Sequence, residues 1–250
     1  MDNIFISKLF RWDNRSARPW HRIVNKVLSR CNLDAQLGPR SFTWGMANVE
    51  ARMNLFHLAS QCAAYNVQGD FVELGCNAGE SSVVIQKIIS SLAPEKELYC
   101  YDSFEGLPDI ADGDAKDSVY EKGSMRASLE SFQRNFKIAG LKAPQNVVKG
   151  FFDKTIPQCL PDKIAFALLD CDLYESTKFV LPHVYSRMTR GAICMFGVYF
   201  DEEKYNPPAT IKEYKSPGAR RAGDEFFLDK AEKISVLYAN EYSNGYFRKM

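Results

Sequence analysis

Three apolar stretches of the sequence end in residues that could bind a small molecule or act on it. "FVEL" runs into Gly75, "LYCY" stops at Asp102 and "FALL" stops at Asp170. Glycine lets the backbone approach a ligand closely, whereas a carboxylate can accept hydrogen bonds from hydroxyls or remove a proton. Ligands of open α/β sheets bind outside the carboxyl ends of the strands. The three stretches therefore predict one shared crevice.

The first stretch, "DFVELGCNAGESS", places a glycine turn between an expected strand and an expected helix. Such a turn aims free backbone N–H groups at a ligand. It lacks the G-x-G-x-x-G pattern of dinucleotide sites, and Gly75 with Glu73 fits the carboxypropyl group of S-adenosylmethionine better than a pyrophosphate. A purely structural role for the glycines is the alternative.

Asp102 lies 29 residues after Glu73, at the end of the next expected strand. A carboxylate in that position can accept hydrogen bonds from both ribose hydroxyls of a nucleoside. The rest of "DSFEGLP" is then expected to shape the loop around the sugar. A solvated loop acid is the alternative, but it does not account for the aromatic, glycine and proline residues that follow.

Asp170 comes directly after a buried strand, so we expect it at the floor of the crevice as the best candidate for a general base. Asp172 is equally consistent with a helix N-cap. The histidines compete poorly, because His57 and His183 fall on expected helices, where structural or solvated roles are expected. His21 is a candidate only if the N-terminal segment folds over the acceptor.

The elements that must position these residues alternate along the chain. Strands are expected in "FVEL", "ELYCY", "NVV", "IAFALL" and "AICMF", and helices in "GESSVVIQKIISSL", "MRASLESFQRNFKIAG" and "YESTKFVLPHVYSRM". This alternation predicts an α/β fold with a mostly parallel sheet covered on both faces. "ISVLYANEYSNGYFRKM" predicts a closing hairpin with one antiparallel strand near the C-terminus. The helical "NVEARMNLFHLASQCAAY" indicates an N-terminal helical cap over residues 1–65, ahead of a ligand-binding domain over residues 66–250.

Composition argues against several classes of function. The 250 residues carry a net charge of +1 with a pI near 7.5, so no overall field favours nucleic acid or an anionic membrane. The longest apolar runs are too short to cross a bilayer, and the N-terminus lacks the apolar core of a signal peptide. Seven cysteines without CxxC spacing indicate reduced, mostly buried thiols rather than a disulfide or zinc framework. We therefore expect a cytoplasmic protein.

Five segments together resemble a known family. "GDFVELGCNAGESS", "YDSFEGLP", "VKGFFDKTIP", "LLDCDLYEST" and "SPGARRAGDEFF", within the span from about Asn48 to Phe227, are similar to the macrocin O-methyltransferases, which methylate sugar hydroxyls on macrolides and related natural products. The resemblance implies a class I methyltransferase (Rossmann-like) fold, S-adenosylmethionine as cofactor and a small-molecule acceptor. The family commonly needs magnesium to bind vicinal hydroxyls of the acceptor sugar.

The resemblance also implies roles for particular residues. The methionine end of the cofactor would be lined by Glu73, Gly75, Asn77 and Ser81, the ribose by Asp102 and Ser103, and the adenine side by Phe151, Phe152 and Asp153. Asp170 matches the family's metal ligand and candidate base, and it borders the cofactor as well.

The sequence departs from the family at one chemically important place. The family's next strand ends in two adjacent carboxylates that complete the metal site, whereas this chain has Phe196 and Gly197 there. Magnesium needs several oxygen ligands, which one carboxylate rarely supplies, so a magnesium requirement is doubtful. Asp201, Glu202 or Glu203 would have to substitute through a rearranged loop.

The function indicated is S-adenosylmethionine-dependent methylation of a hydroxyl on a natural product, with a glycoside sugar as the expected acceptor. Two alternatives stay open: a catalytically silent or divergent cofactor-binding protein of the same fold, and a metal-independent methyltransferase acting on a non-sugar acceptor. The polar insert at 109–124 is expected to be either a mobile lid or a plain solvated loop. The sequence does not identify the acceptor or the methylated atom, and it leaves a homo-oligomer open.

Overall fold

The computed structural model describes residues 19–31, 33, 48–114, 120–200, 217–239 and 243–250. The strands within these residues are β1 (Asp70–Leu74), β2 (Leu98–Asp102), β3 (Asn146–Lys149), β4 (Ile164–Leu169), β5 (Met188–Phe196), β6 (Ser235–Leu237) and β7 (Asn244–Arg248). The helices are α1 (Pro19–Arg30), α2 (Val49–Ala64), α3 (Glu80–Leu92), α4 (Leu129–Ile138), α5 (Phe152–Cys159), α6 (Tyr174–Arg187) and α7 (Pro217–Phe226).

The strands form one sheet in the order β3-β2-β1-β4-β5-β7-β6. Neighbours from β3 to β5 are parallel, and β7 runs antiparallel to both β5 and β6. The predicted α/β fold, its parallel sheet and its antiparallel C-terminal strand are therefore confirmed. Because the strand order reverses between β1 and β4, their carboxyl ends open the crevice in which ligands of such sheets bind.

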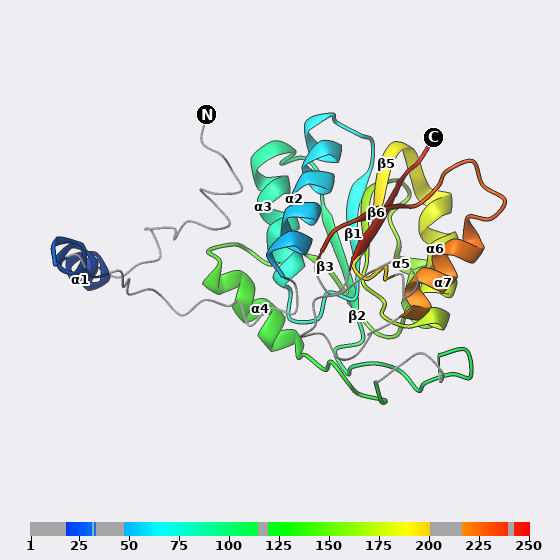
Figure 1. The fold of residues 1–250 in the computed structure, drawn as a ribbon, viewed down its shortest axis with the longest axis horizontal. Helices are drawn as coiled ribbons and strands as arrows, with labels where there is room; N and C mark the ends of the chain where they lie inside the picture. The colour runs from blue at the N-terminus through cyan, green and yellow to red at the C-terminus, as the bar shows by residue number, and fades with distance from the viewer. Residues whose placement is uncertain (1–18, 32, 34–47, 115–119, 201–216, 240–242) are drawn as a thin grey trace.

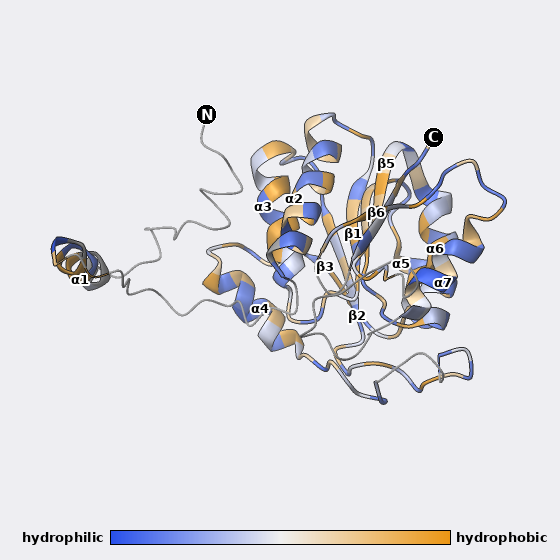
Figure 2. Cartoon of the chain, in the orientation of Figure 1, coloured by the Kyte–Doolittle hydropathy of each residue, from blue (hydrophilic) through white to orange (hydrophobic). Residues whose placement is uncertain are grey.

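Helices cover both faces of the sheet, with α2, α3 and α4 on one side and α5, α6 and α7 on the other (Figure 1). All six residues of β4 are buried, as expected for a strand between two helical layers. Figure 2 shows hydrophobic colours gathered in the central strands. Phe71 and Phe166 lie in the core on the α3 side, whereas Tyr101 and Phe196 lie in the core on the α6 side.

Helix α2 belongs to one of these layers, since it packs against α3 and β5. The side chain of Asn48 caps it by accepting a hydrogen bond from the N–H group of Ala51 at 2.8 Å. The amide of Asn48 also donates to the carbonyl of Ala239 at 2.6 Å, so the start of α2 is fixed to the C-terminal part of the chain. The division at residue 65 stays a prediction.

Helices α1, α5 and α7 were not predicted from the sequence. Helix α5 contains Pro157, and α7 begins at Pro217 and contains Gly218 and Gly223, residues that weaken a helical signal. Tertiary packing explains the glycines of α7. A Cβ atom on Gly218 would lie 2.8 Å from the backbone nitrogen of Tyr174, so only glycine lets α7 approach α6 this closely.

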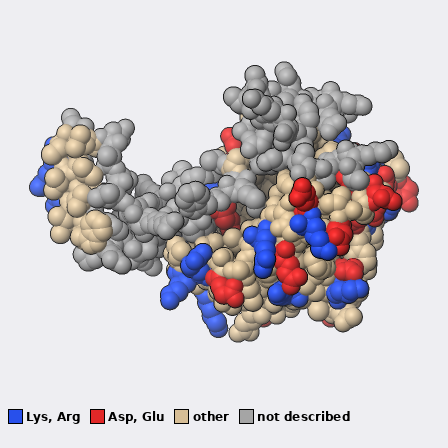
Figure 3. All heavy atoms as spheres, turned by 90° about the horizontal axis from the view of Figure 1, so that it is seen from below, with Lys and Arg blue, Asp and Glu red and all other residues tan. Residues whose placement is uncertain are grey.

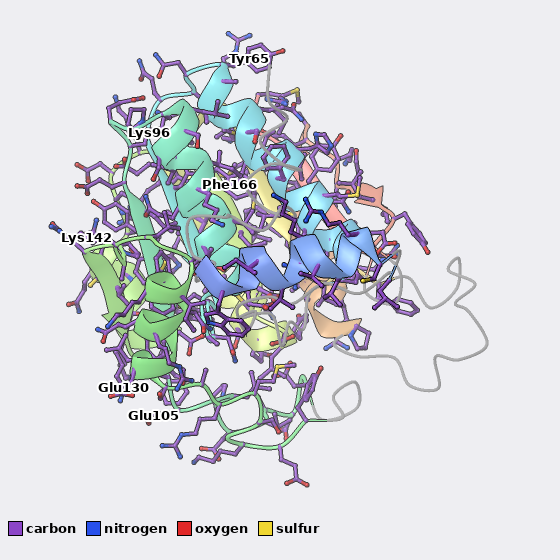
Figure 4. All side chains as sticks on the ribbon, turned by 90° about the vertical axis from the view of Figure 1, so that its left-hand side faces the viewer. Tyr65, Lys96, Glu105, Glu130, Lys142 and Phe166 are labelled. Carbon is purple, nitrogen blue, oxygen red and sulfur yellow. The ribbon has the colours of Figure 1, made fainter. Side chains whose placement is uncertain are left out.

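The two ends of the sheet differ in what surrounds them. In Figure 4, Tyr65 and Lys96 lie at the end that holds the start of the parallel strands, and Glu105 lies at the opposite end, just beyond β2. Figure 3 shows acidic and basic side chains interspersed on the face seen from below. None of the described helices has the length and hydrophobicity needed to span a bilayer.

Candidate active site

The site is built on the carboxyl ends of four neighbouring strands. The N–H group of Asp170 donates a hydrogen bond to β1 at 2.9 Å, that of Gly197 donates to β4 at 2.8 Å, and that of Gly75 donates to β2 at 2.8 Å. Each bond extends the sheet by one residue beyond the paired strands. Together with Asp102 at the end of β2, these residues form a row across the sheet, which we call the edge row.

Gly75 is the residue that lets the middle of the edge row form. Its φ angle is +90°, a region that residues with a Cβ atom rarely occupy. A Cβ atom built there would lie 2.0 Å from the carbonyl oxygen of Asp170. The turn after β1 therefore lies directly against the backbone after β4, and Asp170 has a fixed position relative to that turn.

A cavity of about 820 Å³ opens over the edge row. This volume is in the range of pockets that hold drug-sized ligands. Of the residues predicted to contact the cofactor, those that line the cavity are Gly75, Asn77, Ser81, Asp102, Ser103, Phe151, Phe152, Asp153 and Asp170. Segments far apart in the sequence are thus brought together at one site.

Both carboxylate oxygens of Asp102 hold neighbouring turns in place. One accepts a hydrogen bond from the N–H group of Asn77 at 2.8 Å, and the other accepts from the N–H group of Phe104 at 2.7 Å. Asn77 and Phe104 have φ angles of 44° and 53°, so the bonds stabilise two turns of unfavourable conformation. Burial raises the pKa of Asp102, and these two bonds oppose the rise. Each oxygen keeps a further lone pair with which it can accept a hydrogen bond from a hydroxyl group.

Asn77 and Ser103 also shape the loops around Asp102. The amide of Asn77 donates to the carbonyl of Met125 at 2.5 Å and so joins the turn after β1 to the end of the insert. The hydroxyl of Ser103 donates to the carbonyl of Gly106 at 2.7 Å and accepts from the N–H group of Glu105 at 3.0 Å. Both residues line the cavity while holding its wall.

Glu73 lies behind the wall of the cavity, whereas the sequence predicted it in the wall. It is fully buried and does not line the cavity. Its carboxylate accepts a hydrogen bond from Ser81, which does line the cavity, and another from Ser82 at 2.5 Å. Burial raises the pKa of Glu73 to about 7, with an added contribution from the nearby charge of Asp170. Glu73 is therefore placed behind the cavity wall, where it bonds Ser81, and its predicted place beside the cofactor remains a prediction.

Asp170 presents a carboxylate to the cavity with a pKa suited to proton transfer. Burial, together with the negative charge of Asp102, raises this pKa to about 6. The side chain lies over Gly197, where a Cβ atom would come 2.2 Å from Oδ1 of Asp170. Gly197 therefore provides the space that Asp170 occupies. A carboxylate with a raised pKa at a cavity wall is a typical general base.

Phe196 and Gly197 lie in different environments, one in the core and the other at the cavity. Phe196 is fully buried in the core on the α6 side, with its ring 5.3 Å from that of Tyr199, so it cannot touch a ligand in the cavity. Phe196 therefore contributes to the hydrophobic core and not to the wall of the cavity. Gly197 lines the cavity but has no ligand atom in its side chain.

These strand ends do not fit a magnesium ion, which needs several oxygen ligands. Within the described ranges, no group of three His, Cys, Asp or Glu side chains is placed to hold a metal. The substitutes considered from the sequence, Asp201, Glu202 and Glu203, lie outside the described residues.

Sequence reasoning missed the residues that two helices turn toward the cavity. Helix α2 contributes Arg52 and Leu55, and α3 contributes Glu80 and Lys87. Arg52 and Glu80 form an ion pair at 3.5 Å that joins the two helices. Their common orientation could have been predicted from helical spacing, because positions 80, 83, 84 and 87 share one face of α3 and all line the cavity. Only the fold shows that this face borders the site.

The family described as Macrocin-O-methyltransferase (TylF) matches residues 17–216 of the chain. The demethyldecarbamoylnovobiocin O-methyltransferase of Streptomyces niveus is 28% identical over 180 residues, which cover 68% of this chain and 67% of that protein. The mycinamicin III 3''-O-methyltransferase of Micromonospora griseorubida is 28% identical over 190 residues, which cover 72% and 69% of the two chains.

Solved structures show the same fold. The O-methyltransferase NovP superposes with a TM-score of 0.68 at 24% identity, covering 81% of each chain. The calicheamicin methyltransferase CalS11 superposes with a TM-score of 0.59 at 19% identity, covering 95% of this chain and 97% of that one. The fold is thus that of class I O-methyltransferases, as predicted. Since the family match spans most of the sequence, the chain belongs to the macrocin O-methyltransferase family.

Proposed function

We propose that this enzyme methylates a hydroxyl group on the sugar of a glycosylated natural product, with S-adenosylmethionine as methyl donor and Asp170 as general base. The observation that carries the proposal is the edge row, in which the Asp170 carboxylate faces a cavity beside Asp102, with a pKa raised to about 6. Relatives that methylate novobiocin and mycinamicin precursors support the acceptor class.

The two halves of the cavity suit the two reactants. On the cofactor side, Asp102 can accept the ribose hydroxyls, and Gly75 leaves room for the methionine end. Phe152 and Asp153, at the start of α5, border the region we assign to the adenine. The faces of α2 and α3 remain for the acceptor, and Arg52 offers hydrogen-bond donors suited to sugar oxygens.

The chemistry needs little beyond placement and a base. S-adenosylmethionine supplies a methyl group on a positively charged sulfur. Asp170 and the faces of α2 and α3 would hold the acceptor oxygen in line with that methyl group, which lowers the entropic part of the barrier. As the new carbon–oxygen bond forms and the carbon–sulfur bond breaks, Asp170 takes the proton of the acceptor hydroxyl. No metal step is included, because Gly197 offers no side-chain oxygen to complete a magnesium site beside Asp170.

Product formation with and without a chelator tests the proposal. The protein would be incubated with S-adenosylmethionine and a panel of glycosylated metabolites, and S-adenosylhomocysteine would be measured. We expect acceptor-dependent release that persists in excess EDTA. If EDTA abolished turnover and magnesium restored it, the metal-free site would be wrong, and Asp170 would have to share a metal with Asp172 or with residues 201–203.

The catalytically silent alternative rests on one observation, the glycine at position 197 in place of a carboxylate. It predicts cofactor binding without turnover on any acceptor of the panel. Cofactor binding alone cannot separate the two functions, so acceptor-dependent S-adenosylhomocysteine release is the deciding measurement. For either function we infer work in a reducing compartment such as the cytoplasm, since all seven cysteines are free thiols.

A further inference from the structure

The two ends of the insert between β2 and α4 are joined to each other at its base. The N–H group of Leu107 donates to the carbonyl of Ser124 at 2.9 Å, and that of Gly123 donates to the carbonyl of Leu107 at 2.9 Å. Tyr120 and Lys122 of the same insert line the cavity. The described part of the insert is therefore a wall of the site with defined hydrogen bonds.

The far part of the insert reaches helix α6 through Asp114. This side chain is only 3% exposed, and its Oδ1 atom accepts hydrogen bonds from the N–H groups of Tyr174 at 2.6 Å and Glu175 at 3.4 Å. The N-cap residue of α6, Leu173, has no side chain that can bond these groups. Asp114 thus acts as the N-cap of a helix that begins 60 residues later in the chain.

A second contact fixes the same junction from α7. The guanidinium group of Arg221 lies over the ring of Tyr174 at 4.1 Å and donates a hydrogen bond to the carbonyl of Gly113. The hydroxyl of Tyr174 donates to Glu225 at 2.6 Å. Arg221 of "SPGARRAGDEFF" therefore has a structural role, because it holds the insert and α6 together.

The turn that Asp114 stabilises is the one that follows the candidate base. Asp170 is separated from α6 by three residues, and one of them, Asp172, has a φ angle of 58°. Asp172, Glu175 and Ser176 all line the cavity. A cap on the first N–H groups of α6 therefore fixes a turn that carries cavity side chains and has an unfavourable conformation.

We propose that Asp114 is a positioning residue for methyl transfer: by capping α6 it holds the turn from Asp170 to Glu175 in the shape that the reaction needs. This inference rests on the proposed function, in which Asp170 is the base. It gives the insert a role beyond covering the cavity, since one of its buried side chains shapes the opposite wall of the site.

Three substitutions at this position separate capping from charge. Asp114→Asn keeps an oxygen that can accept the two bonds, Asp114→Ala removes it, and Asp114→Glu keeps the charge on a longer side chain. The matched control is Asp112→Ala, which removes an exposed acid of the same insert. For each variant we would measure kcat, KM for cofactor and acceptor, and hydrogen exchange of the Tyr174 and Glu175 amides.

We expect Asp114→Ala to speed exchange of both amides and to lower kcat by roughly tenfold to a hundredfold, the cost of a small misplacement of reacting groups. The KM for S-adenosylmethionine should change by less than about threefold, because the edge row is intact. Asp114→Asn should keep slow exchange and most of kcat, Asp114→Glu should lose both, and Asp112→Ala should behave as native.

Two results would overturn the inference: a native kcat in Asp114→Ala despite fast amide exchange, or equal losses of kcat in Asp114→Asn and Asp114→Ala. If Asp114→Ala does not fold, the comparison of the other two variants still tests the inference. It requires a higher kcat for Asp114→Asn than for Asp114→Glu. A native protein that protects these amides yet turns over no acceptor would contradict the proposed function and would leave the cap itself in place.

Discussion

Asp102 illustrates how one side chain can serve both the fold and the site. We predict that Asp102→Ala weakens S-adenosylmethionine binding by about 1.5–3 kcal/mol, the range for hydrogen bonds to a charged group. Part of this loss comes from the turns at Asn77 and Phe104, which lose their hydrogen bonds to the carboxylate. Calorimetric titration of the folded variant measures the effect.

The matched control for that titration is Glu105→Ala. Glu105 lies in the same loop, and its ion pair with Lys149 at 3.2 Å is exposed, so its removal should leave the affinity almost unchanged. An Asp102→Ala variant that folds and binds the cofactor as tightly as Glu105→Ala would remove the ribose assignment.

Asp170 gives a prediction about pH. Burial and the charge of Asp102 raise its pKa to about 6, and only the ionised form can accept a proton. The methyl-transfer rate should therefore be low below pH 6, rise as the pH passes through about 6 and level off above it. Asp170→Asn should lower the rate by about 10²–10⁴-fold and abolish this dependence. Single-turnover rates measured from pH 5 to about pH 8, across the expected pKa, test both statements.

A pH profile that is unchanged in Asp170→Asn would assign the titration to another group. Glu73 is the one to examine next, because its pKa is raised to about 7 and it bonds Ser81 at the cavity wall. Glu73→Gln would then shift the profile while Asp170→Asn would not.

At the scale of elements, the junction of β1 and β4 depends on Gly75. We predict that Gly75→Ala destabilises the protein by more than about 2 kcal/mol, because the new Cβ atom would clash with the carbonyl oxygen of Asp170 in addition to straining the backbone. Gly140→Ala is the control, since Gly140 also has a positive φ angle but no atom within 4 Å of a built Cβ.

Denaturant unfolding of the two glycine variants isolates the clash. The strain at φ > 0 is common to both, so the difference between them measures the contact with Asp170. Equal losses of stability in Gly75→Ala and Gly140→Ala would mean that the turn after β1 can move away from β4, and that the edge row is not rigid.

The sequence predicted the elements of the sheet well, because five apolar runs and their glycine or aspartate ends are local signals. The orientation of Glu73 was not a local signal. Its side chain points from β1 toward α3, where it is buried and bonds Ser81 and Ser82, so it does not line the cavity. The cavity residues of α2 and α3 could not be assigned, because their position depends on how the helices pack.

At the scale of the whole molecule, stability should not depend on disulfide bonds. All seven cysteines are free, and five of them are buried, so the core does not need a covalent link. We expect a reductant to leave the melting temperature almost unchanged in a thermal unfolding experiment. A drop of about ten degrees would contradict this, since removing a disulfide costs about 2–5 kcal/mol.

The contact between Gly197 and Asp170 has a consequence for installing a metal-binding carboxylate at position 197 by mutation. Converting Gly197 to an aspartate would place its Cβ atom 2.2 Å from Oδ1 of Asp170, so a carboxylate at this position does not fit while Asp170 keeps its rotamer. A Gly197→Asp variant would therefore have to move the side chain of Asp170, the residue on which the proposed chemistry depends.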